Sequence, residues 1–223
     1  MKRKGRYLGL SLLLLLLLFN ACSVALFNGY RPKDDFSGNL PRSWFAADSG
    51  HFLFNTSIDL MKNHFSGIMV IKPVADGYYR VVFITEVGLK IFDMEFSPDR
   101  QTKVHYMMDA MNKKGLVNTL SNDISLVLMN GLSDVQPDIL EKRDSEDVIF
   151  RYREHKTRSY YFLSGAHDKP HMAKQTGSIS NKARADLFGS NHTGIDSVKI
   201  THYNLGLSIN LYRINEESNH VAE

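Results

Sequence analysis

Cysteine is nearly absent from this chain of 223 residues, because Cys22 is the only one. A single cysteine excludes an internal disulfide. Proline is scarce, at 6 residues, and no low-complexity stretch follows the N-terminal apolar run. The patterns His-Glu-x-x-His and Gly-x-Ser-x-Gly and a phosphate-binding loop are also missing. These absences favour a folded, non-catalytic domain, for which we expect no cofactor.

The N-terminus predicts export. Four basic residues within positions 2–6 precede the apolar run Leu8–Phe19, which contains seven consecutive leucines. A charged segment followed by an apolar one is typical of a secretory signal peptide. The run has about 12 residues, whereas a transmembrane helix needs roughly 20. An uncleaved anchor helix is therefore the weaker alternative.

The apolar run ends in Phe19-Asn20-Ala21-Cys22. A small residue directly before a cysteine resembles the lipobox of bacterial lipoproteins, in the looser form of Bacteroidetes. The resemblance implies cleavage before Cys22 and two or three acyl chains on that cysteine, which suffice for stable membrane anchoring. It implies an outer-membrane lipoprotein in the cell envelope. Acidic residues directly after the lipidated cysteine resemble a surface-export tag in Bacteroidetes, but here Ser23, Val24 and Ala25 follow Cys22, so we expect the protein to face the periplasm. An ordinary signal peptide that happens to contain a cysteine remains the alternative.

The composition changes once the signal peptide is removed. The chain has 27 basic and 24 acidic residues, and four basic ones lie in the signal, so 23 remain against 24. A nearly neutral mature chain gives no support for nucleic-acid binding. We expect a signal peptide at 1–21, the lipidated cysteine and a flexible tether at 22–43, one β-rich domain at 44–215 and a polar tail at 216–223.

Alternating apolar residues predict ten strands. They are expected at 52–60, 67–74, 78–86, 90–96, 102–107, 148–153, 159–163, 183–188, 198–203 and 207–214. An apolar stripe at helical spacing predicts one amphipathic helix over 112–129. The stretch 133–147 is expected to form turns, and the polar stretch 164–180 a long loop.

The expected fold is mainly β (α+β): a curved antiparallel sheet or half-open barrel of about ten strands, with one central amphipathic helix as plug or lid. This element order, over about residues 45–214, resembles the LolA/LolB lipoprotein-carrier fold. In that fold an unclosed barrel carries helices on its concave side. The resemblance implies non-catalytic binding of an acyl chain or a lipoprotein, so we expect lipids or other lipoproteins as partners.

Large apolar side chains on one face of the expected sheet and helix are the candidate ligand-binding residues. They are Phe83, Phe92, Met94, Phe96, Leu120, Ile124, Phe150 and Phe162. A sheet crossed by a single helix can leave a cavity for acyl chains. The alternative is a plain core filled by the helix.

Other polar groups offer weaker candidates for chemistry. The segment 167–171 carries two histidines and an aspartate, but it reads better as a solvated loop than as a metal site. Glu86, Asp93 and Glu95 fit a solvated outer face better than an acid/base pair. His202 is expected at the edge of the core. Three functions stay open: a lipid-binding lipoprotein, a partner-binding envelope protein without a small ligand, and an enzyme that uses Glu86 or His167.

Overall fold

The computed structural model describes residues 29–214 except 34–35, 37, 46–49, 75–76, 144, 155, 166, 178–179 and 191–192. The predicted signal peptide, Cys22 and the C-terminal tail lie outside these residues, and their assignment stays a prediction. Within the described part, no helix combines the length and the apolar character needed to cross a membrane.

In the described part of the chain, one antiparallel sheet of thirteen strands and one helix make up the fold, which confirms the expected architecture. The strands follow one another in the sheet as β1-β7-β8-β9-β10-β11-β12-β13-β2-β3-β4-β5-β6, so β1 and β6 are its edges. The bounds are β1 Tyr30–Pro32, β2 Phe52–Leu60, β3 Asn63–Pro73, β4 Tyr79–Thr85, β5 Lys90–Phe96, β6 Thr102–Met107, α2 Lys114–Leu128, β7 Asp138–Lys142, β8 Val148–Glu154, β9 Thr157–Leu163, β10 Met172–Thr176, β11 Asn181–Ser190, β12 Gly194–His202 and β13 Leu207–Arg213.

All ten predicted strands are present, and three more were missed. β7 and β10 lie in stretches expected to be turns and a long loop, and β1 lies in the expected tether. β10 was not predicted because its inward positions hold Ala173 and Gln175, so no large apolar side chain marks the alternation. β1 has three residues and ends in Pro32, and strands this short carry no periodic signal.

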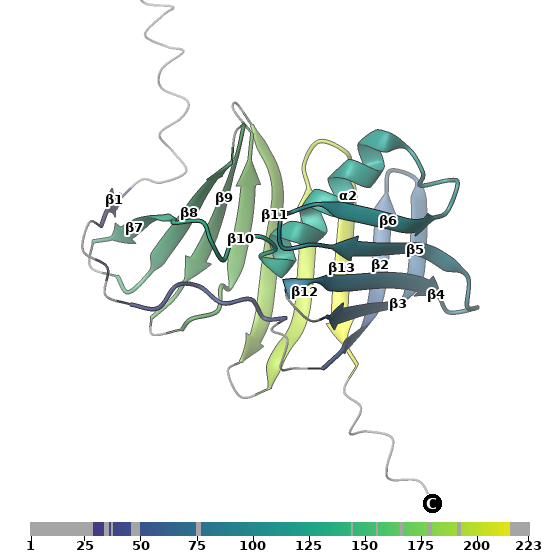
Figure 1. Cartoon of the computed structure of the whole chain (residues 1–223), viewed down its shortest axis with the longest axis horizontal. Helices are drawn as coiled ribbons and strands as arrows, with labels where there is room; N and C mark the ends of the chain where they lie inside the picture. Colours follow the sequence, from purple (N-terminus) through teal and green to yellow (C-terminus); the bar gives the residue numbers. More distant parts are fainter. Residues whose placement is uncertain are drawn as a thin grey trace, which may run out of the picture.

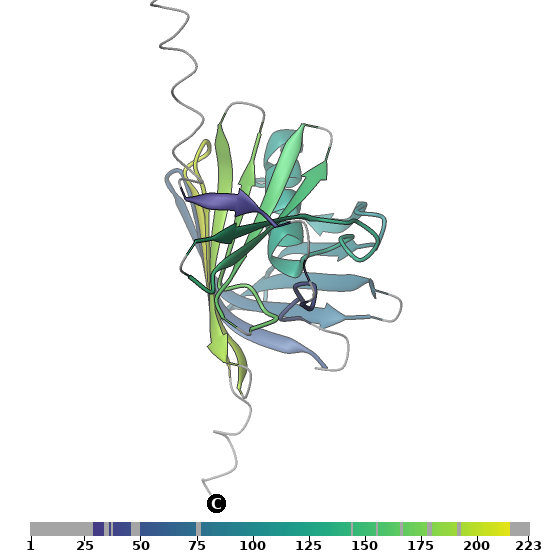
Figure 2. The same cartoon turned by 90° about the vertical axis from the view of Figure 1, so that its left-hand side faces the viewer.

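Helix α2 lies across the concave side of the curled sheet (Figure 1), and in the turned view it sits between the sheet's two ends (Figure 2). It forms where predicted, within two residues at its start. Its C-terminal cap is Met129, in the left-handed conformation at φ 57°. Gly131 follows, also with positive φ, and this sharp stop returns the chain to β7.

A segment of residues 38–45, which we call the strap, crosses the opening of the half-barrel between β1 and β2. The Arg42 N–H donates to the Asp168 carbonyl at 2.7 Å, and the Trp44 Nε1–H donates to the Pro170 carbonyl at 2.7 Å. Phe45 is fully buried, with its ring centroid 5.1 Å from that of Phe52. Part of the stretch expected to be a flexible tether therefore packs against the domain.

Candidate functional site: the interior of the half-barrel

Seven of the eight predicted ligand-binding residues meet in one cluster on the inner face. The cluster includes Phe83, Phe92, Met94, Phe96, Leu120, Ile124 and Phe150. None of the seven exposes more than 3% of its surface. Phe83 and Phe92 pair across β4 and β5, with ring centroids 5.7 Å apart. The alternation of the strands thus brings these side chains together as predicted, while their binding of a ligand stays a prediction.

Phe162 is the exception, and its placement on the inner face was wrong. It belongs to a second cluster with Leu140, Ile149 and Tyr160. Its neighbours on β9, Tyr161 and Leu163, take the inner face instead. Both faces of β9 are apolar from Tyr160 onward, so alternation alone could not decide which face points inward.

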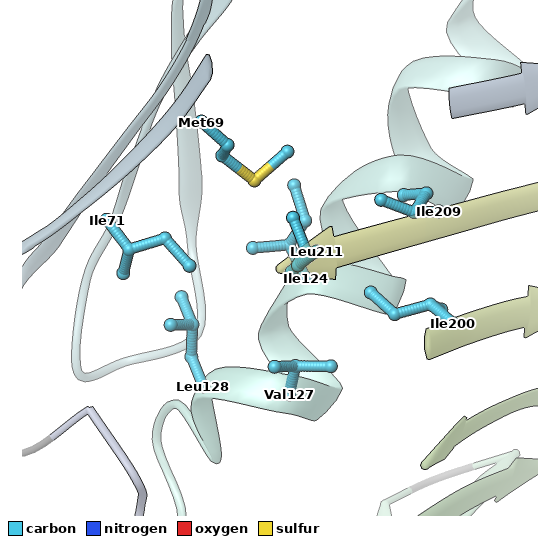
Figure 3. A pocket seen from close by; sticks show the side chains of 8 residues that line it. All are labelled: Met69, Ile71, Ile124, Val127, Leu128, Ile200, Ile209 and Leu211. Atoms are coloured by element: carbon cyan, nitrogen blue, oxygen red, sulfur yellow. The ribbon is translucent and has the colours of Figure 1, made fainter. Parts of the chain in front are cut away.

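The space between helix and sheet is closed. Ile124, Val127 and Leu128 face residues of β3, β12 and β13 (Figure 3), leaving a void of about 10 Å³. A void of this size holds one water molecule at most, whereas pockets for small ligands measure roughly 300–1,000 Å³. The helix in this position fills the interior, as the packed-core alternative expects.

Residues of the strap line two further pockets, which we call the mouth pockets. One, of about 270 Å³, lies between the strap, Tyr79, Tyr152 and the C-terminal end of α2. The other, of about 300 Å³, is lined by Phe36, Phe150 and Leu163 among others. Leu128 lines both the first pocket and the void, and Phe150 belongs to the inner-face cluster. Both pockets therefore reach the apolar interior.

Polar contacts tie the C-terminal end of α2 to both walls of the sheet. Asn130 Nδ2 donates to the Ser97 carbonyl at 2.8 Å, and Arg100 Nε donates to the Gly131 carbonyl at 2.7 Å. The same Arg100 forms an ion pair with Glu154 at 2.6 Å. We call these five residues the latch. They connect the β5–β6 turn, the end of the helix and the end of β8.

A buried contact between Asp123 and His202 holds the middle of α2. Asp123 is fully buried, and its Oδ1 lies 3.1 Å from His202 Nδ1. Burial raises the pKa of the Asp123 carboxyl, and the hydrogen bond to His202 only partly opposes this. His202 lies at the edge of the core, as predicted. Asp123 was missed, although it stands three residues after Leu120 and four before Val127, on the apolar side of the helix.

The outer-face candidates form ion pairs. Arg80 contacts Asp93 at 2.5 Å and Glu95 at 3.2 Å. Burial alone would raise the pKa of Asp93, but hydrogen bonds from Arg80 and Lys90 outweigh it and lower that pKa. Glu86 lies exposed on the turn after β4. Among the described residues, no group of three or more His, Cys, Asp or Glu is arranged to hold a metal ion.

No family model and no curated protein matches this chain. Similar solved structures include a LolA superfamily protein from Nitrosomonas europaea, 10% identical, with 77% of this chain and 87% of that one covered and a TM-score of 0.48. A DUF1329 family protein from Desulfovibrio piger is 9% identical over 76% and 86% of the two chains, with a TM-score of 0.42. A protein domain from Vibrio parahaemolyticus, described as outer membrane lipoprotein-sorting, is 10% identical over 78% and 86%, with a TM-score of 0.41. These likenesses assign the chain no activity.

Proposed function

We propose that this chain is an envelope lipoprotein, anchored by acyl chains on Cys22, whose half-barrel binds an acyl chain or an acylated protein without chemical change. The anchor would hold it on the outer membrane, facing the periplasm. The ligand would replace helix α2 on the inner face, where Phe83, Phe92, Met94 and Phe96 line the wall.

The observation that carries the proposal is an apolar wall under the helix together with polar contacts that end beside a pocket. Ile124, Val127 and Leu128 of α2 face only apolar side chains, and the two hydrogen bonds of the latch hold the C-terminal end of the helix beside one of the pockets. Two further polar contacts, Asp123 with His202 and the Tyr161 hydroxyl with the Leu126 carbonyl, must also break when the helix moves. Two latch atoms, Arg100 Nη2 and Asn130 Oδ1, are buried without a hydrogen-bond partner among the described residues. Each such atom costs about 1–3 kcal/mol, so the closed latch stabilises the helix weakly.

The minimum length of the acyl chain follows from the apolar burial that α2 loses when it moves outward. Moving α2 outward exposes its five buried apolar side chains, each at most 3% exposed: Leu120, Ile124, Leu126, Val127 and Leu128. Exposure costs roughly 2 kcal/mol for each side chain, or about 10 kcal/mol together. A buried methylene contributes about 0.8 kcal/mol. Roughly thirteen methylenes are therefore needed before an acyl chain taken from water can replace the helix, so long chains should bind and short ones should not.

Native mass spectrometry on the mature chain with Cys22→Ser, purified without detergent, tests the proposal. We expect a complex with hexadecanoate and none with octanoate at the same concentration. Glu154→Gln weakens the latch and should increase the bound fraction severalfold. Glu141→Gln is the matched control, because it removes a carboxylate from a 2.6 Å ion pair with Lys33, at the β1–β7 edge of the sheet.

Two results would contradict the proposal. One is a chain that stays free of hexadecanoate even with Glu154→Gln. The other is an equal increase in the bound fraction of hexadecanoate with Glu154→Gln and with Glu141→Gln, which would show that binding does not depend on the latch.

The second candidate is a partner-binding envelope lipoprotein without a small ligand. The void of about 10 Å³ favours it, because the core is complete with the helix in place. In that case no variant binds hexadecanoate, and pull-down of envelope proteins by the mature chain becomes the informative experiment.

A further inference from the structure

A third pocket lies outside the half-barrel interior. It has a volume of about 420 Å³ and opens between the strap, the β9–β10 connection and the end of β11. Its lining is Trp44, Ser164, His167, Lys169, His171, Leu187, Gly189 and Ser190. It shares no residue with the void under α2. An inference about it therefore does not depend on the proposed function.

The polar lining of this pocket can donate hydrogen bonds and carries no carboxylate. An ammonium, two imidazoles and two hydroxyls face it from Lys169, His167, His171, Ser164 and Ser190. An ammonium only donates, and imidazoles and hydroxyls can do so. A lining of this kind favours an anionic group and disfavours a cation.

Two of the carboxylates near the pocket are in ion pairs: Asp168 lies 3.7 Å from Arg42, and Asp186 lies 2.6 Å from Arg184. Asp147 accepts a hydrogen bond from Ser164 Oγ at 3.1 Å, so this hydroxyl can serve a ligand as a donor only if that bond breaks. No ion pair is found for Lys169 within the described part of the chain. Its Nζ lies over the Trp44 ring instead, 4.8 Å from the centroid. Lys169 is therefore the charge available to a ligand.

The volume indicates more than a bare ion. A pocket of about 420 Å³ falls within the range of small-molecule sites. Trp44 and Leu187 form its apolar floor and belong to the main core, so this floor is held rigidly. Trp44 is the aromatic residue of the lining, and its ring lies beside Lys169 Nζ.

We propose that this pocket binds the phosphate group of a phosphate ester, with Lys169 pairing with the phosphate and Trp44 contacting the organic part. The phosphate could belong to a free ester or to the headgroup of a phospholipid. Both sources offer the same oxyanion to the same donors.

Calorimetric titration of the mature chain with Cys22→Ser tests the inference, with sn-glycerol 3-phosphate as probe and glycerol as the uncharged counterpart. We expect saturable binding of the ester and none of glycerol. Lys169→Gln should weaken binding at least tenfold. Lys103→Gln, which changes an exposed lysine on the edge strand β6, should leave binding unchanged.

Vesicles distinguish the two sources of phosphate. Sedimentation with vesicles of phosphatidylglycerol that depends on Lys169, without binding of the soluble ester, identifies a headgroup. Binding of the soluble ester identifies a free ligand. The inference fails if neither probe binds, if glycerol binds as well as its phosphate, or if Lys103→Gln weakens binding as much as Lys169→Gln.

Discussion

Removal of His202 should destabilise the fold by an amount that grows with pH. Asp123 Oδ1 contacts His202, and Oδ2 is buried without a hydrogen-bond partner among the described residues. With His202→Ala, the folded state can avoid a bare buried charge only by protonating Asp123. This costs at most 1.36 kcal/mol per pH unit above the unfolded value of 3.8. The contribution from the carboxyl is then at most about 4 kcal/mol at pH 7 and about 1.6 kcal/mol at pH 5.

The sign follows from the direction of the pKa shift. The pKa of Asp123 is raised in the folded state. Its contribution to stability is therefore fully present below pH 3.8 and is lost as pH rises through the folded pKa. His202→Ala removes a hydrogen bond to the charged form and raises that pKa further. The loss of unfolding free energy caused by His202→Ala must therefore be larger at pH 7 than at pH 5.

Urea unfolding followed by Trp44 fluorescence measures the effect, because Trp44 is the only tryptophan and is 7% exposed. Asp123→Asn provides the control background, where His202→Ala removes the same ring without leaving a carboxylate. There no carboxyl stands at position 123, so the difference between the losses at pH 7 and pH 5 should be smaller than in the native background. A loss that is independent of pH in the native background, or equally dependent on pH in both backgrounds, would refute the reasoning.

Three further predictions concern the latch, the outer face and the core. Gly131→Ala should cost at least about 2 kcal/mol in urea unfolding, because φ is +67° and the new Cβ would meet Arg100 and lie 2.6 Å from the Pro98 carbonyl; an unchanged midpoint would contradict this geometry. Arg80→Gln should lower the free energy of unfolding by about 1–2 kcal/mol above pH 4. This loss should shrink as pH falls below 3.8, because the lowered pKa of Asp93 gives stability that is lost when acid protonates the carboxyl. A loss of the same size in acid would contradict this prediction. Phe92→Ala should lower the free energy of unfolding by about 3–5 kcal/mol, since Phe92 is fully buried, and a loss below 1 kcal/mol would show that the site relaxes.

Much of the fold could be predicted because its signals are local. β2, β5 and β6 have the predicted bounds, since each alternates apolar and polar residues between clear turns. Strands without such a pattern were missed. β7 is a short strand next to the edge strand, and β10 places Ala173 inward.

The candidate site, too, could be predicted only where its signals are local. The inner-face aromatic residues of β5 could be assigned, because Asp93 and Glu95 mark the other face of this strand as polar. Phe162 could not, because β9 is apolar on both faces. The pairing of Asp123 with His202 spans 79 positions, and no local pattern reports such a contact.

The sequence by itself determined which segments alternate apolar and polar residues as strands do and which segment has apolar residues at helical spacing. It also determined that the N-terminal segment predicts export. These properties depend on the spacing of neighbouring residues. Only the tertiary structure decided that β13 lies beside β2, that the helix closes the interior to about 10 Å³ and that Arg100 reaches Glu154. Each depends on the packing of distant segments against one another, which local periodicity leaves undetermined.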